Sequence, residues 1–261
     1  MCYEKNLNKM TWNNRVIITV VLLFVSICAK AQVSGTINYK LTIVDPALNS
    51  ISTINSVLYI NDNKSLQVNL GKDTKPQAVD ENTIIDVFKG RAKFVLKDFK
   101  KKTLLLSDNI VVKTYLISDT LLNFKWSITK EKRKISNFTC TKALLNFRGR
   151  SYIAWFANDI PIQNGPWKFC GLPGLIIKIS DDKDIFTYEL TGIDLKTKLE
   201  KNIVSIPVSY SKDQPITHKE YFLLFNKKAL DFEKMAKVVH TGKNGGWSSG
   251  TVVLPTKQEK F

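Results

Sequence analysis

The chain has 261 residues, enough for one large hydrophobic core or two small ones, and a formal net charge of +16 from 39 basic and 23 acidic residues. Such a charge raises nucleic acid as a partner, but only five of the basic residues are arginine, whose planar fork reads base edges. We therefore expect no nucleic-acid binding. The lysine-rich runs at residues 97–102 and 130–134 are interpreted as solvated turns or sheet edges.

Residues 1–31 have the features of a signal peptide in the usual order. Basic residues precede an uncharged, mostly apolar run at Val16–Ile27, and Ala29 and Ala31 occupy the two positions that a signal peptidase reads. A membrane-spanning helix needs about 20 apolar residues, so we expect no permanent anchor after cleavage. Lipidation at Cys28 is the rival interpretation, which the large side chain at the preceding position disfavours.

Residues 32–261 contain no repeat, linker or low-complexity tract, so we expect a single domain. The signal peptide predicts that this domain is exported and is periplasmic, secreted or associated with the outer membrane. Apolar residues alternate with a period of two through most of this span, which is typical of short antiparallel strands. Such strands are predicted at Val33–Ile43, Ser56–Ile60, Ser65–Leu70, Ala92–Phe99, Thr103–Leu106, Ile110–Ile117, Thr120–Ile128, Asn137–Phe147, Ser151–Ala157, Leu175–Ser180, Asp184–Ile193 and Ile203–Val208.

Turn residues separate these strands, among them Ser107–Asn109. Two hairpins are predicted with their turns, one at Asn146–Arg150, where Gly149 takes a positive φ, and one at Asp181–Asp184. A single amphipathic helix is predicted at residues 217–239, because a capping box opens it and apolar residues follow at helical spacing. We therefore predict a mainly β protein, a curved antiparallel sheet or half-open barrel with one helix near the C-terminus.

The segment Asp159–Asp181 (DIPIQNGPWKFCGLPGLIIKISD) concentrates proline, glycine and aromatic residues before an apolar strand. Such a density of residues with special backbone preferences indicates that the path of the chain is specified position by position. Pro173 and Gly174 are predicted at the two central positions of a type II turn, which requires a positive φ at Gly174.

Two cysteines, Cys140 and Cys170, remain after the predicted cleavage, and in an oxidising compartment we expect them to form a structural disulfide. A redox role is the alternative, but the chain has no C-x-x-C motif. Metal binding is disfavoured because neither His218 nor His240 stands at ligand spacing from a cysteine. No cofactor motif is found.

Few candidate catalytic residues are visible. Residues 246–250 (GWSSG) match the nucleophile-elbow pattern, but they lack a preceding strand, a following helix and a later histidine. The aspartates at 181–184 are interpreted as turn residues, and His218 as an exposed residue at the start of the helix. Asp159 is a candidate ion-pair partner of Arg148 or Arg150. Four aromatic residues are candidates for lining an apolar ligand cleft, although they also fit an ordinary β-rich core: Trp155, Phe156, Trp167 and Phe225.

The segment Cys140–Asp181 resembles the core of the GLPGLI family of exported Bacteroidetes proteins. The resemblance rests on Gly149-Arg150, Tyr152, Ala154-Trp155-Phe156, Ile160-Pro161-Ile162, Gly165-Pro166, Phe169 and the hexapeptide Gly171, Leu172, Pro173, Gly174, Leu175, Ile176. It implies an exported protein without established activity, and a shape similar to the periplasmic lipoprotein-carrier type. We expect the hexapeptide itself to be structural, since fold likeness assigns no function.

These observations favour a non-catalytic exported binding or interaction module. Within that class we expect either a carrier of an apolar ligand or a scaffold for an envelope protein, with the oligomeric state undetermined. The alternative is an envelope-modifying hydrolase, which would require titratable residues to converge on one pocket, for example Asp159 and Asp181 near His218 or His240.

Overall fold

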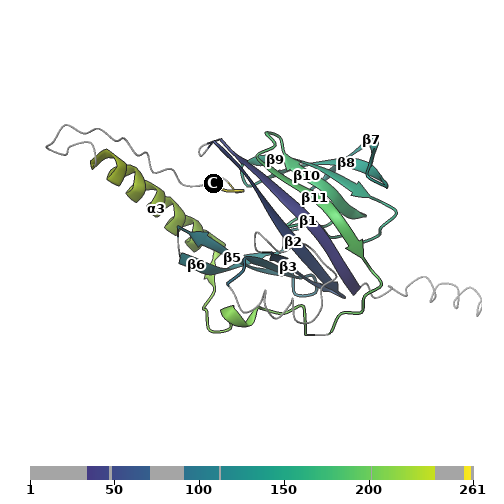
Figure 1. Cartoon of the computed structure of the whole chain (residues 1–261), viewed down its shortest axis with the longest axis horizontal. Coiled ribbons are helices and arrows are strands. Elements are labelled where there is room, and N and C mark those ends of the chain that lie inside the picture. Colours follow the sequence, from purple (N-terminus) through teal and green to yellow (C-terminus); the bar gives the residue numbers. More distant parts are fainter. Residues whose placement is uncertain are drawn as a thin grey trace, which may run out of the picture. The chain divides into compact units, whose positions relative to one another are not determined.

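The computed structural model describes residues 34–46, 49–70, 91–111, 113–200, 202–238 and 256–259, with side chains described for all of these except 232–238. The predicted signal peptide, His240 and the motif at 246–250 lie outside the described residues. The elements are β1 (Ser34–Asp45), β2 (Ser50–Asn61), β3 (Lys64–Asn69), β4 (Phe94–Asp98), β5 (Thr103–Ile110), β6 (Lys113–Thr120), β7 (Ser127–Ile135), β8 (Phe138–Phe147), β9 (Arg150–Ala157), β10 (Leu175–Asp181), β11 (Phe186–Asp194), the 3₁₀-helix η1 (Val208–Tyr210), β12 (Ile216–Thr217) and α3 (His218–Val238) (Figure 1).

All the described strands form one sheet in the order β12-β6-β5-β4-β3-β2-β1-β11-β10-β9-β8-β7. From β1 the chain adds strands outward to β6, then crosses to the far edge at β7 and returns strand by strand to β11, which pairs with β1. Every neighbouring pair is antiparallel except β12 and β6. Helix α3 packs beside β5, β6 and β12 (Figure 1). The predicted mainly β fold with one C-terminal helix is therefore confirmed.

The sheet is strongly curved, and side chains connect its two ends. Asp119 lies in β6 near one end of the strand order, and Arg148 lies in the turn between β8 and β9 near the other. Arg148 Nη1 is nevertheless 2.8 Å from Asp119 Oδ2. Within the described residues no ladder of backbone hydrogen bonds joins the two ends, so the sheet is not closed into a barrel.

Both predicted hairpins are confirmed. The β8–β9 turn consists of two residues, Arg148 and Gly149, with φ of 44° and 72°. Two positive φ values define the type I′ turn that matches the twist of the flanking strands. Helix α3 begins at His218 with the predicted capping box, in which the Thr217 N–H donates to Glu220 Oε2 (2.7 Å) and the Glu220 N–H donates to Thr217 Oγ1 (3.2 Å).

Among the predicted boundaries that are wrong, three are explained by tertiary contacts that override the local pattern. Residues 107–109, predicted as a turn, continue β5, whose polar side chains are bound by groups from other elements. Residues 121–126, predicted as a strand, carry Phe124 and Trp126 onto an aromatic cluster around Phe169. Residues 203–208 lie outside any strand and pack Val204 against the sheet.

The lysine run at 97–102 begins with a buried ammonium group rather than a solvated one. Lys97 is fully buried in β4, and its Nζ donates to Asn164 Oδ1 (2.8 Å), Gly165 O (2.8 Å) and Phe169 O (2.9 Å). Burial lowers the pKa of Lys97 to about 8. The glycine- and proline-rich segment therefore folds around this single cation. By contrast, residues 130–134 lie exposed in the edge strand β7, as predicted.

The type II turn predicted at Pro173-Gly174 is not present. Gly174 does not have a positive φ, whereas Gly171 does, at 88°. Gly174 is instead required by a close approach, because a Cβ there would lie 2.0 Å from the carbonyl oxygen of Ala157. The glycine thus lets the segment cross against the end of β9.

The predicted disulfide is not formed, since Cys140 and Cys170 are both free and buried. The two thiols have different surroundings. Cys140 lies on β8 among apolar residues that include Trp155 and Ala157, whereas Cys170 lies in the segment folded around Lys97. Burial raises the pKa of both thiols, which keeps them protonated.

Candidate functional site

A cavity of about 420 Å³ lies between the curved sheet, helix α3 and the C-terminal segment Thr256–Glu259. Its walls come from β1 to β6, from β11, from the first turns of α3 and from the glycine- and proline-rich segment. The exposed surface of the wall is mainly apolar, and twelve of the 25 lining residues are apolar: Leu41, Ile43, Ile54, Phe94, Val95, Leu106, Val111, Ile117, Trp167, Phe186, Phe222 and Phe225. A volume in this range and largely apolar walls are usual for small-molecule sites.

A first polar cluster lines the cavity around Asp108 of β5. The Asp108 carboxylate accepts hydrogen bonds from Lys257 Nζ (2.6 Å), Lys93 Nζ (2.6 Å) and the Tyr221 hydroxyl (2.8 Å). Burial by itself would raise the pKa of Asp108, but the two ammonium groups lower it below its ordinary value. Asp108 is therefore ionised, and it fixes the C-terminal segment to the first turn of α3.

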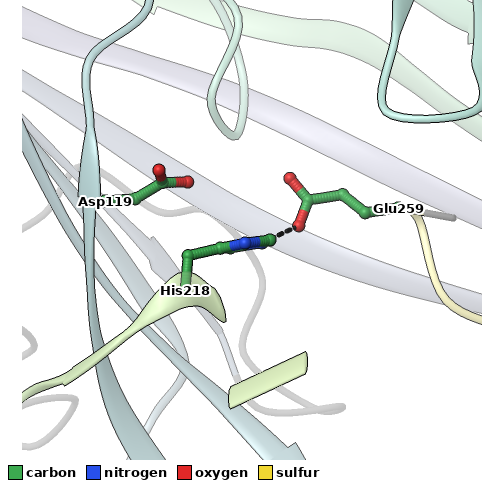
Figure 2. Close-up of side chains that lie close together, drawn as sticks. All are labelled: Asp119, His218 and Glu259. Atoms are coloured by element: carbon green, nitrogen blue, oxygen red, sulfur yellow. Dashed lines mark hydrogen bonds and ion pairs between the residues drawn. The ribbon is translucent and has the colours of Figure 1, made fainter. Parts of the chain in front are cut away.

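A second polar cluster lies where β6, α3 and the C-terminal segment meet (Figure 2). His218 Nε2 is 2.5 Å from Glu259 Oε2, and Glu259 Oε1 accepts from Arg148 Nη1 (2.7 Å) and Lys168 Nζ (2.6 Å). Asp119 binds the same two cations, Arg148 at 2.8 Å and Lys168 at 2.9 Å. The five side chains are between 3% and 15% exposed. We call these residues the Glu259 cluster.

The two carboxylates of the Glu259 cluster are held ionised. Burial opposes this, but hydrogen bonds and the charges of the neighbouring cations lower the pKa of Asp119 and of Glu259 to about 2 each. A general acid or base is most effective when its pKa is near the working pH. These carboxylates are therefore suited to ion pairing rather than to proton transfer at neutral pH.

The residue types of the cluster also suit a metal ion, since one ligand atom from each of Asp119, His218 and Glu259 lies within 4.8 Å of the others. The carboxylate oxygens, however, are already bound by the side chains of Arg148 and Lys168. An added cation would be repelled by both. The arrangement is a charge-balanced ion-pair network, and we do not assign it as a metal site.

The segment Thr256–Glu259 is held along its whole length. Thr256 donates from its N–H and its hydroxyl to Asp45, at 2.9 and 2.8 Å. Arg150 Nη2 donates to the Lys257 carbonyl (2.9 Å), and the Tyr152 hydroxyl donates to the Gln258 carbonyl (2.8 Å). The segment thus connects β1, β5, β9 and α3 across one side of the cavity.

Two polar atoms of cavity-lining residues have no hydrogen-bond partner within the described part of the chain. They are the carboxamide oxygen of Asn109 and the carboxamide nitrogen of Gln258. The Gln258 carboxamide oxygen is bound by the Tyr188 hydroxyl at 3.2 Å. Buried polar groups are normally paired, so these two atoms are exceptions among the residues around the cavity.

Two of the four predicted lining residues are at the cavity wall, namely Trp167 and Phe225. Phe156 is 1% exposed and packs within the apolar core beneath Phe169. Trp155 packs in a different cluster, with the Arg133 guanidinium 4.2 Å from its ring centroid. Successive side chains of a strand point to opposite faces, so Trp155 and Phe156 could not both face one cavity.

Of the residues proposed for a hydrolase, the three that the structure describes do not form one site, and His240 lies outside the described residues. Asp159 is exposed, and Asp181 is buried in an ion pair with Arg150 (2.7 Å). The pairing suggested between Asp159 and an arginine is therefore wrong for Arg150, whose partner is Asp181. His218, interpreted as an exposed capping residue, has a side chain only 11% exposed and contacts Glu259.

Sequence reasoning missed most of the Glu259 cluster, because its members lie at positions 119, 148, 168, 218 and 259 and share no motif. Within the described residues, helix α3 does not combine the length and the apolar character that crossing a membrane requires.

Comparison with known proteins finds one family model, described as "Protein of unknown function (Porph_ging)", which matches residues 148–178. This match falls inside the segment that resembles the GLPGLI family. It covers β9, the segment folded around Lys97 and the first residues of β10. The family that the model describes is associated with Bacteroidetes and has no known function. No curated protein matches the chain.

Among solved structures, the chain is similar to PNGF-II, with a TM-score of 0.50 and 17% sequence identity over 76% of this chain. It spans about a third of that protein, 34% of its length. A LolA superfamily protein from Nitrosomonas europaea is also similar, with a TM-score of 0.31 and 11% identity over 68% of this chain and 92% of the other. At such identities the likeness to PNGF-II concerns the fold alone.

Proposed function

We propose that this protein is an exported, non-catalytic binding protein that carries a small, largely apolar molecule in the cavity between its sheet and helix α3. The observation that carries the proposal is the cavity itself, about 420 Å³, whose mainly apolar surface is interrupted by polar groups from β3, β5, α3 and the C-terminal segment. This combination binds an apolar body by burial and orients it by a small number of polar contacts.

The carrier role is better supported than the scaffold role. A scaffold for an envelope protein would be expected to have a filled core, because protein interiors are packed as densely as organic crystals. The apolar clusters around the cavity are filled in this way, with Leu58, Leu66 and Ile176 fully buried. An apolar cavity that is left unfilled beside such a densely packed core supports a bound ligand.

Export and an envelope location rest on the predicted signal peptide, and they remain part of this proposal. The glycine- and proline-rich segment has a structural role in it. By folding around Lys97, this segment places Trp167 in the cavity wall and Lys168 in the Glu259 cluster. The GLPGLI hexapeptide thus positions the site and does not bind the ligand itself.

The hydrolase alternative has less support. The two carboxylates closest to His218 are ion-paired, and their pKa is about 2, well below the range in which a carboxyl group donates a proton at neutral pH.

Native mass spectrometry of the protein purified from its own cell envelope tests the proposal. We expect an additional mass that is lost in the denatured spectrum, and its value would begin to identify the ligand. A bare mass in both spectra would favour the scaffold role.

A pair of variants in β2 locates the binding site. Ile54 lines the cavity, whereas Ile51 in the same strand is 72% exposed and lies away from it. Ile54→Trp should place an indole in the cavity and abolish retention of the ligand. Ile51→Trp is the control, because it makes the same chemical change without filling the cavity, and it should retain the ligand. Retention of the ligand by Ile54→Trp would show that it binds elsewhere.

A further inference from the structure

The Glu259 carboxylate is bound as a ligand carboxylate would be. One oxygen accepts from Arg148 and Lys168, and the other pairs with His218. Two oxygens shared among three donors is the pattern of charge-assisted recognition. These three donors come from a β-turn, a loop folded around a buried cation and the first turn of α3, so the sheet and its packed elements hold them in place.

Glu259 itself belongs to the C-terminal segment and not to the sheet. Both Glu259 and His218 are at the cavity wall, next to apolar side chains such as Phe222. The carboxylate binding site therefore adjoins the apolar cavity. A molecule in the cavity could extend one end to these donors if the Glu259 side chain moved away.

The charges of the cluster determine what could replace Glu259. Among the described members, Arg148 and Lys168 carry two positive charges, and Asp119 and Glu259 carry two negative charges. Loss of Glu259 would leave one positive charge in excess where the side chains are 3–15% exposed. An uncompensated charge at such burial is costly, so the replacement must be an anion.

We propose that the molecule carried in the cavity is an amphiphile with a single carboxylate head group, and that Glu259 occupies the head-group position in this structure. This inference rests on the proposed function and adds the class of ligand. The apolar chain would lie along the cavity walls. The head group would bind Arg148, Lys168 and His218 in place of Glu259, so binding and displacement of the C-terminal segment would be coupled.

Isothermal titration calorimetry with two probes of equal chain length tests this inference on the full chain. Dodecanoate carries the carboxylate, and dodecanol replaces it with an uncharged hydroxyl. We expect dodecanoate to bind at least about tenfold more tightly than dodecanol, because one charge-assisted hydrogen bond is enough to give that ratio of affinities. Equal affinities would overturn the head-group inference and leave the carrier role standing. Absence of binding by both probes would overturn the carrier role and the inference with it.

Glu259→Gln removes the competing carboxylate and should raise the ratio of dodecanoate to dodecanol affinity by about tenfold. Glu189→Gln is the matched control, because it makes the same change in net charge on β11, where Glu189 pairs with Lys178 and Lys40. The control should leave the ratio unchanged. If both variants give the same ratio, Glu259 does not compete with the head group.

Lys168→Met provides a second, independent readout. It removes one donor to the head group and should lower the same ratio by about tenfold. Dodecanol affinity is measured in every variant as a control. Loss of the cavity would lower the affinity for both probes, whereas a change in head-group recognition would alter only the ratio between them. An unchanged ratio in Lys168→Met would overturn the assignment of the head group to this cluster.

Discussion

Replacing Lys97 with methionine should destabilise the fold, because this ammonium group is the centre around which the glycine- and proline-rich segment folds. Its three hydrogen bonds reach Asn164, Gly165 and Phe169. Losing three hydrogen bonds from a charged donor costs roughly 6 kcal/mol. Removing a buried charge whose pKa has fallen from 10.5 to about 8 returns about 3 kcal/mol. We therefore expect Lys97→Met to lower the free energy of unfolding by about 3 kcal/mol at pH 7.

The pH dependence of the same variant gives a sharper test. Between the folded pKa of about 8 and the unfolded value of 10.5, the unfolded chain keeps the Lys97 proton and the folded protein loses it. Raising the pH through this window therefore stabilises the folded protein. Between pH 7 and pH 9.5 this contribution amounts to about 2 kcal/mol, and it is absent from Lys97→Met. The destabilisation caused by the variant should thus grow from about 3 to about 5 kcal/mol.

Urea denaturation of both proteins at pH 7 and pH 9.5 measures these differences, and subtracting the two curves removes the contributions of all other titrating groups. Lys100→Met is the control, since Lys100 belongs to the same lysine run but is exposed in the β4–β5 turn. It should change the free energy of unfolding by less than about 0.5 kcal/mol. A stability difference between wild type and Lys97→Met that does not change with pH would refute the assignment of a buried ammonium group.

Two further predictions concern the glycines and the C-terminal segment. Gly174→Ala should destabilise the protein by about 3 kcal/mol, because its Cβ would overlap backbone, whereas Gly171→Ala, with open space but a φ of 88°, should cost only about 1–2 kcal/mol. Similar melting temperatures for the two variants would contradict the close approach at Gly174. The pKa of Glu259 is lowered from 4.5 to about 2, so its contribution of about 3 kcal/mol is present above pH 4.5 and lost as the pH falls through 2. Acid denaturation should show this loss in the wild type and not in Glu259→Gln, and identical acid curves would mean that Glu259 is not ion-paired.

Local patterns predicted the elements whose stabilising contacts are themselves local. The capping box at Thr217 and the hairpin turn with a positive φ at Gly149 depend on residues within a few positions of one another, and both are formed as predicted. The alternation of apolar residues also predicted most strands. It failed at residues 107–109, where Asp108 lies within a strand and its charge is compensated by Lys93 and Lys257.

Tertiary contacts explain the errors at the candidate site in the same way. Nothing near Lys97 in the sequence indicates that its ammonium group is buried, since its acceptors lie some 70 residues away. Cys140 and Cys170 were predicted to pair because they are the two cysteines left after the predicted cleavage. The number of cysteines does not show where their side chains lie, and in the structure the two thiols have different environments.

By itself, the sequence determined that this is a mainly β protein with one capped helix and a segment of closely specified backbone, because these features follow from periodicity, propensity and turn chemistry over a few residues. Only the tertiary structure decided that the sheet curves until Arg148 meets Asp119, that a cavity is left inside the curve, and that Glu259 lies at its wall. The physical reason is that charges pair through space. Five residues spread from position 119 to 259 form one ion-pair network, and no pattern along the chain records which of its many charged residues will be neighbours.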